Sequence, residues 1–166
     1  MKITHSMQDM KMNELLSNNI VNVPFVSNIN VTENYYWNII EDIKWYYLSR
    51  DYGYEANDKV AEYLIERKYS VEEIANLHNF IVNQREIIKN FIHAFLRGCP
   101  KHEKEMYKLG DDGTWDLSSH IVGMGKQMMD LVLGNPELIF TLQKIKVENF
   151  EYGFDKAIYE LNEKNE

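Results

Sequence analysis

The sequence has a single cysteine, Cys99, and only three prolines among its 166 residues. One cysteine excludes an intrachain disulfide framework and is typical of proteins of a reducing compartment. The chain has no run of 18 apolar residues, and its N-terminus has no signal-peptide core, so we expect a cytoplasmic protein without a membrane-spanning helix. Neither a Walker loop nor the dinucleotide-binding glycine pattern is present, which argues against the common nucleotide-binding folds.

Basic residues are also scarce. Lysine and arginine number 18 against 26 acidic residues, which gives a formal net charge of −8, and no basic cluster occurs. Nucleic-acid binding depends on phosphate neutralisation by such clusters, so we expect no direct contact with DNA or RNA. An acidic surface favours basic protein partners, or it simply maintains solubility. The composition, rich in Asn, Ile and Lys, is compatible with an AT-rich genome such as that of a phage.

What the sequence does contain is a strong helical pattern. Hydrophobic residues make up 45% of the chain, which is typical of a globular domain with a core. Ser70 and Glu73 form a capping box before a long apolar repeat, and Gly98 and Pro100 form a stop signal after it. The sequence therefore predicts a helix over 71–97, with Gly98 in the left-handed position beyond its end.

Shorter apolar patterns of the same period flank this helix. Polar caps and glycine-containing breaks separate them from one another. They predict further helices over 33–50, 58–68, 101–108, 115–133 and 136–162, with Asn57 and Asn135 as caps and with breaks over 51–56 and 110–113.

The predicted fold is an all-α, single-domain helical bundle of about five helices around the long central helix (71–97). Residues 1–31 surround Pro24 with Asn and β-branched residues, and they predict an irregular or partly extended N-terminal arm, with a short strand or hairpin as the alternative. The bundle is expected over 32–162, followed by an acidic tail over 163–166.

Two of the predicted helices carry more apolar residues than one buried face needs. The surplus residues lie off the main apolar face of the first helix after the arm, and on a second side of the last helix. They are Trp37, Trp45, Leu48, Tyr152 and Tyr159. Because tryptophan and tyrosine dominate the energetics of protein interfaces, we predict that these residues bind a partner, including a second copy of the chain. The alternative is that other helices of the same domain cover them.

The best local candidate for chemistry lies in the predicted helix after the glycine-rich break. Asp116 and His120 are four residues apart and share a helix face, so the carboxylate can orient the imidazole as a general base requires. Ser119 is a conceivable nucleophile, although the Gly-x-Ser-x-Gly elbow is missing. The alternative interpretation is an exposed Asp–His pair that adds a few tenths of a kcal/mol to the helix.

Metal-binding patterns are weak. The five histidines are scattered, and no pair has the His-Glu-x-x-His spacing of a zinc site. Cys99 and His102 lie close in the sequence, but a structural zinc ion needs four ligands. Asp111, Asp112 and Asp116 miss the alternating pattern of a calcium loop. We therefore expect no metal ion and no cofactor.

These patterns favour a small acidic protein–protein interaction module, a regulator or inhibitor that acts by surface binding and forms a homodimer. Its partner is expected to be another protein, with a basic groove as one option. The alternative is an enzyme or a metal-dependent protein with a helical site around Asp116 and His120. The lack of a complete catalytic set favours the first hypothesis.

Overall fold

The longest element is helix α5, which runs from Val71 to Gly98. In the computed structural model, which describes residues 31–98, 103–144 and 150–164, every regular element is a helix. The prediction of an all-α single domain is therefore confirmed. The N-terminal arm predicted over 1–31 lies outside the described residues except for Val31, and Cys99 lies outside them too.

The start of α5 follows the predicted capping box. The Ser70 amide donates to Oε2 of Glu73 at 2.8 Å, and the Glu73 amide donates to Oγ of Ser70 at 3.2 Å. The backbone and side-chain hydrogen bonds from Ser70 hold the pKa of the Glu73 carboxyl below its ordinary value. At the other end, Gly98 is the last helical residue and does not adopt the left-handed conformation, so that detail of the prediction is wrong.

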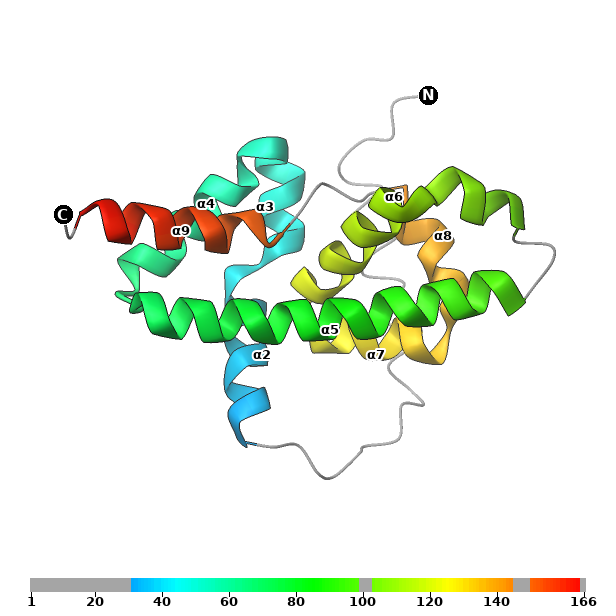
Figure 1. Cartoon of the computed structure of the whole chain (residues 1–166), viewed down its shortest axis with the longest axis horizontal. Coiled ribbons are helices and arrows are strands. Elements are labelled where there is room, and N and C mark those ends of the chain that lie inside the picture. The colour runs from blue at the N-terminus through cyan, green and yellow to red at the C-terminus, as the bar shows by residue number, and fades with distance from the viewer. Residues whose placement is uncertain (1–30, 99–102, 145–149, 165–166) are drawn as a thin grey trace.

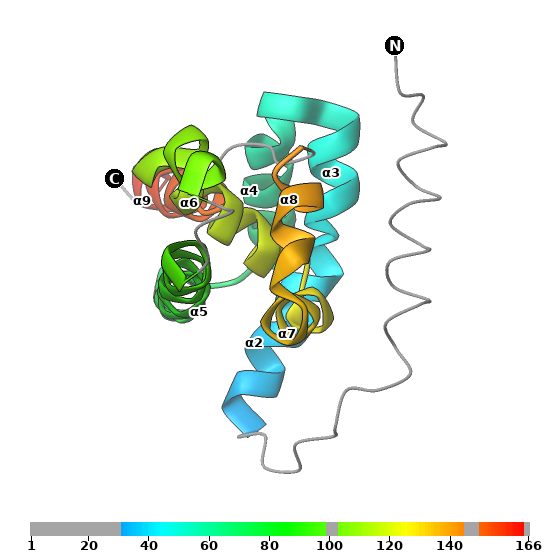
Figure 2. The same ribbon diagram turned by 90° about the vertical axis from the view of Figure 1, so that its right-hand side faces the viewer.

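Helix α5 crosses most of the width of the molecule in Figure 1, and two helices lie along it. Helix α6 (Glu103–Gly123) packs on its C-terminal half, and α9 (Tyr152–Glu163) packs on its N-terminal half. Helix α4 (Ala56–Glu66) covers α9 from the other side. Figure 2 looks along α5 and shows α6 and α9 one behind the other beside it. The start of α9 and the middle of α6 therefore lie on the same side of α5.

The buried face of α5 has the expected helical spacing. Its buried residues recur every three or four positions and are Ile74, Leu77, Ile81, Arg85, Ile88, Ile92 and Leu96. One of them, Arg85, is charged. A charged side chain at a core position must be paired, because an isolated charge away from water is very costly. The pairing of Arg85 organises the site described below.

The helix predicted over 33–50 is divided into two. Helix α2 (Val31–Ile43) and helix α3 (Trp45–Tyr52) are separated by Lys44, which has φ 56° and ψ 46°. A lysine in this left-handed region is held there by its surroundings, because its own conformational preference opposes it. The break turns α3 out of the line of α2. Helix α2 buries Ile39, Ile40 and Ile43 together with Trp37, whereas α3 buries Trp45 and Ser49.

The predicted loop over 51–56 is also largely helical. A 3-10 turn, η2 (Gly53–Glu55), leads directly into α4, and Asn57 lies inside α4 rather than at its cap.

Glycines divide the later helices. The break predicted over 110–113 is reduced to a kink at Gly110 (φ 61°) inside α6. The helix predicted over 115–133 is interrupted at Gly125, whose φ of 99° ends α6 and starts α7 (Lys126–Gly134). The last predicted helix is divided as well, into η4 (Pro136–Leu138), α8 (Ile139–Leu142) and α9. None of the described helices combines the length and apolarity that crossing a bilayer requires.

Gly123 lies where α6 meets α3 and the start of α9. A Cβ atom at this position would lie 2.6 Å from Cδ1 of Trp45 and 2.9 Å from Cγ of Phe150. We expect Gly123→Ala to lower the free energy of unfolding by about 1–3 kcal/mol, because the two rings would have to move. Gly134→Ala is the matched control, since nothing lies within 4 Å of its added Cβ. Equal denaturation midpoints for the two variants would contradict this close packing.

Candidate functional site

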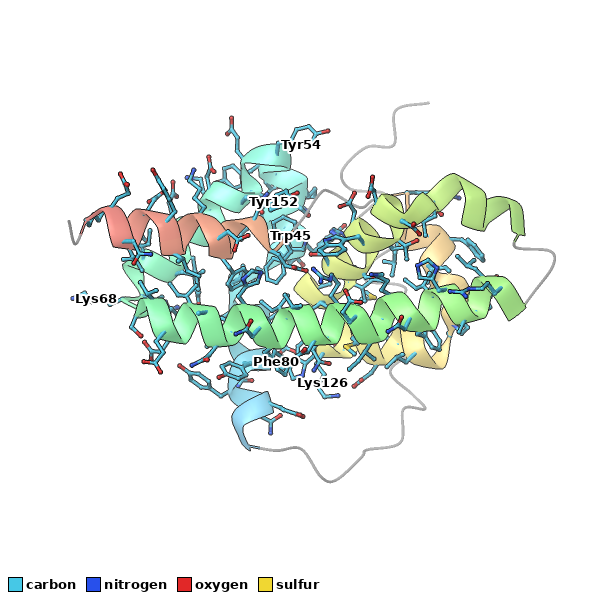
Figure 3. All side chains as sticks on the ribbon, in the orientation of Figure 1. Trp45, Tyr54, Lys68, Phe80, Lys126 and Tyr152 are labelled. Atoms are coloured by element: carbon cyan, nitrogen blue, oxygen red, sulfur yellow. The ribbon has the colours of Figure 1, made fainter. Side chains whose placement is uncertain are left out.

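A partly open cavity of about 540 Å³ lies where α5, α6 and α9 meet. Each of the three helices contributes side chains to its wall. In Figure 3, the labelled Tyr152 marks the α9 side of the cavity, at the start of that helix. The lining residues are His78, Val82 and Arg85 of α5, Asp112, Trp115 and Asp116 of α6, and Glu151, Tyr152 and Asp155 at the start of α9.

A buried ion pair joins two walls of this cavity. Nη1 of Arg85 donates to Oε2 of Glu151 at 2.5 Å, and the side chains of the two residues are only 4% and 6% exposed. Nη2 of Arg85 donates to Oε1 of Glu86 at 3.0 Å. Burial would raise the pKa of the Glu86 carboxyl, but the hydrogen bonds from Arg85 and Lys89 lower it overall. Arg85 therefore binds two carboxylates and links α5 to the start of α9.

This ion pair leaves hydrogen-bonding capacity unused. Nε of Arg85 and Oε1 of Glu151 are buried and have no hydrogen-bond partner among the described residues. Buried polar atoms without partners are uncommon, and they often mark the place of a bound group or an ordered water. Both residues line the cavity. The unused oxygen of Glu151 is thus a buried acceptor that belongs to a residue of the cavity wall.

The indole ring of Trp115 is held at the cavity edge by two cations of α5. The guanidinium carbon of Arg85 lies 3.5 Å from the centroid of the indole, and Nζ of Lys89 lies 5.3 Å from it. Such cation–π contacts are attractive because the face of the ring carries negative potential. Trp115 is nevertheless 37% exposed, so part of its surface is available to a ligand.

His78 provides a second link between α5 and α9. Its Nε2 lies 3.7 Å from Oε2 of Glu151, and its Nδ1 lies 3.4 Å from Oδ1 of Asp155. The imidazole is nearly parallel to the ring of Phe154, with the centroids 6.0 Å apart. The first turn of α9 is therefore positioned by Arg85 and His78 together.

The charge of the cavity wall is predominantly negative. Four carboxylates line it, from Asp112, Asp116, Glu151 and Asp155, against one permanently charged cation, Arg85. Because Arg85 is paired with Glu151, the three aspartates dominate the electric potential of the space. Potential is focused in a cavity with low-dielectric walls, so this site attracts cationic groups and repels phosphates.

The residues predicted for catalysis lie in different environments. Asp116 lines the cavity, whereas Ser119 and His120 are fully buried and do not line it. Nδ1 of His120 accepts a hydrogen bond from Nε1 of Trp45 at 3.0 Å. The alternative interpretation of an exposed Asp–His pair is wrong for His120, which is buried. Its role in the structure is to satisfy the indole N–H of Trp45.

The tryptophans predicted to bind a partner are core residues. Trp45 has no exposed surface and Trp37 is 5% exposed, so their prediction as surface contacts is wrong. The break at Lys44 lets α2 and α3 bury different faces, and Trp37 packs edge-on against Phe80 of α5. Leu48 is half-buried and packs against the core.

The tyrosines of α9 are exposed, in contrast to these tryptophans. Tyr152 lies on the cavity rim and is 56% exposed, and Tyr159 lies two turns further along the helix and is also exposed. These two residues are placed where a partner can reach them.

Sequence reasoning missed most of this site, although one signal was present. Arg85 occupies a position in the buried stripe of α5 between Ile81 and Ile88, and a charge at such a position indicates a buried pair. No pattern in the sequence identifies Glu151, 66 residues away, as its partner. Trp115 was overlooked because no pattern in the sequence indicates that the cations of α5 lie against its ring.

The described residues contain no group of three or more His, Cys, Asp or Glu side chains arranged to hold a metal ion. Comparison of the chain with protein-family models, with curated proteins and with solved structures finds no match. The function is therefore inferred from the geometry and charge of the cavity.

Proposed function

We propose that this protein is a protein–protein interaction module, a regulator or inhibitor that binds a basic partner protein through the cavity between α5, α6 and α9. The observation that carries the proposal is the composition of the cavity wall, in which four carboxylates face one arginine beside two exposed aromatic rings. A site of this kind favours a cation with an apolar stem, which a lysine or arginine side chain provides.

The aromatic rim supports a macromolecular partner. Trp115 and Tyr152 flank the cavity on opposite helices, α6 and α9, and both are substantially exposed. Tryptophan and tyrosine next to a pocket are the typical anchors of protein interfaces, since they supply a large contact area at a low cost in side-chain entropy. The formal net charge of −8 adds long-range attraction toward a basic partner.

A quantitative capture experiment from host extract tests this function. The bait is the full chain, either unaltered or with Asp112→Asn and Asp155→Asn, which remove two exposed carboxylates of the cavity. We expect the double variant to retain at most about one tenth of the captured partner, since two charge contacts of about 0.7 kcal/mol each amount to a tenfold change. Added salt should weaken the capture by the unaltered chain.

The matched control is the double variant Asp111→Asn and Glu163→Gln. It makes the same change in net charge on exposed positions of the same two helices, α6 and α9, outside the cavity lining. We expect it to capture as well as the unaltered chain. Equal losses in both double variants, or capture that is insensitive to salt, would argue against the cavity as the binding site.

The homodimer remains a separate proposal. It is supported by Tyr159, which is exposed on α9 and does not line the cavity. Sedimentation velocity of the unaltered chain and of Tyr159→Ala measures it directly. A monomer at micromolar concentration would remove this part of the proposal and leave the cavity-based function intact.

A further inference from the structure

We infer that the group bound in this cavity is an arginine side chain of the partner, in preference to lysine. This inference rests on the proposed function and specifies the chemistry of its site. It follows from three features of the wall: an existing guanidinium site, a buried acceptor without a partner, and carboxylates on two facing helices.

The wall already holds one guanidinium group in a stable arrangement. Arg85 combines an aromatic face, 3.5 Å away on Trp115, with carboxylates on two sides, from Glu151 and Glu86. Its charge is matched locally by those two carboxylates. A second guanidinium that enters the cavity therefore meets the negative charge of the aspartates, which Arg85 does not neutralise.

The carboxylates of the cavity are spread over two walls. Asp112 and Asp116 are one helical turn apart on α6, and Glu151 and Asp155 are one turn apart at the start of α9. Oε1 of Glu151 belongs to a side chain that is 6% exposed, lines the cavity and has no hydrogen-bond partner at that oxygen among the described residues. It is an acceptor independent of the aspartate cluster.

The planar guanidinium fits this distribution better than an ammonium group. It has five N–H donors directed outward in one plane, which can reach carboxylates on two walls, and its flat face stacks on aromatic rings such as those of Trp115 and Tyr152. It is also more weakly hydrated, so it loses less on entering a partly enclosed space. The compact ammonium of lysine has only three donors and gives up its strong hydration at greater cost.

The test uses three capped tripeptides, acetyl-Gly-X-Gly-amide, in which X is arginine, lysine or citrulline. Citrulline has the shape of arginine without its charge. Binding to the full chain is followed by the fluorescence of Trp115 and its quenching by acrylamide. The signal is specific because Trp37 and Trp45 are buried, whereas Trp115 is exposed at the cavity edge.

We expect the arginine peptide to shield Trp115 from acrylamide and to bind at least fivefold more tightly than the lysine peptide. The citrulline peptide should have no effect. Asp116→Asn should weaken the arginine peptide by about fivefold or more, whereas Asp111→Asn, outside the cavity lining, should change its affinity less than twofold.

Equal binding of the arginine and lysine peptides would overturn the arginine assignment and leave the proposed function standing. Absence of binding by either peptide, with partner capture still dependent on Asp112 and Asp155, would also overturn the assignment alone. Binding of citrulline as tightly as arginine, together with capture that ignores the cavity variants, would overturn both proposals.

Discussion

Arg85→Met is expected to lower the free energy of unfolding by about 3–5 kcal/mol, the usual effect of removing one partner of a buried ion pair. The cause is Glu151, whose side chain is 6% exposed and would be left in the interior without its main counter-ion. His78, 3.7 Å from the same carboxylate, compensates only in part. Urea denaturation of the purified variant followed by circular dichroism measures the change.

A double variant separates this mechanism from a simple loss of packing. Arg85→Met combined with Glu151→Leu removes both charges, and it should recover most of the lost stability because no buried charge remains unpaired. Arg97→Met is the control on the same helix. Arg97 is exposed in the last turn of α5, so its replacement should change stability by less than about 0.5 kcal/mol. If Arg85→Met behaved like Arg97→Met, the buried ion pair would not exist in solution.

The same variant has a consequence for the cavity. Without Arg85, Trp115 loses the guanidinium at 3.5 Å that holds its ring, and the start of α9 loses a buried ion pair with α5. We therefore expect greater acrylamide quenching of Trp115 and a cavity that binds the arginine peptide more weakly, although a positive charge has been removed. A purely electrostatic site would show the opposite change, since removing Arg85 makes the wall more negative.

Trp45→Ala should also lower the free energy of unfolding by about 3–5 kcal/mol. Trp45 is fully buried, and the centroid of its ring lies 5.2 Å from that of Phe150. Its indole also fills the place that a Cβ atom on Gly123 would need. Truncation to alanine leaves a cavity at the junction of α3, α6 and the start of α9. Thermal denaturation should show a midpoint lowered by about 10 °C or more.

Trp45→Phe separates the contribution of the hydrogen bond to stability from that of the packed ring. Phenylalanine keeps much of the apolar volume but cannot donate to Nδ1 of His120, which the indole reaches at 3.0 Å. Leaving a buried acceptor unsatisfied costs about 1–3 kcal/mol, so this variant should fall between the unaltered chain and Trp45→Ala. Tyr54→Ala is the aromatic control, because Tyr54 is 80% exposed. Stability of Trp45→Ala equal to that of Tyr54→Ala would mean that Trp45 lies at the surface after all.

The capping box and the apolar repeat of α5 are features that the local sequence alone predicts. Ser70 and Glu73 are three residues apart and bond to each other, so the start of the helix is encoded where it occurs. The helical class follows for the same reason, because the period of the apolar residues is a property of each segment. Pro136 likewise stands at the first position of the helical turn η4, as its missing N–H predicts.

Local sequence patterns indicate only some of the interruptions in the other helices. A glycine inside a predicted helix is typical of close packing or of a kink, and the structure shows packing at Gly123 and a break at Gly125. Lys44 carried no such signal. Its left-handed conformation is unfavourable for an isolated lysine, and it persists because the packing of α2 and α3 on both sides outweighs that local cost.

Local patterns thus account for the helical class, for the extent of α5 and for the acidity that favours a cationic partner. They also place a charge, Arg85, inside an apolar stripe. Only the three-dimensional packing makes Glu151 the counter-ion, brings Trp115 and Asp155 to the same cavity, and buries His120 and Trp45 against each other. The physical reason is distance along the chain: a cap joins residues a few positions apart, whereas the cavity joins residues brought together by the burial of three helices.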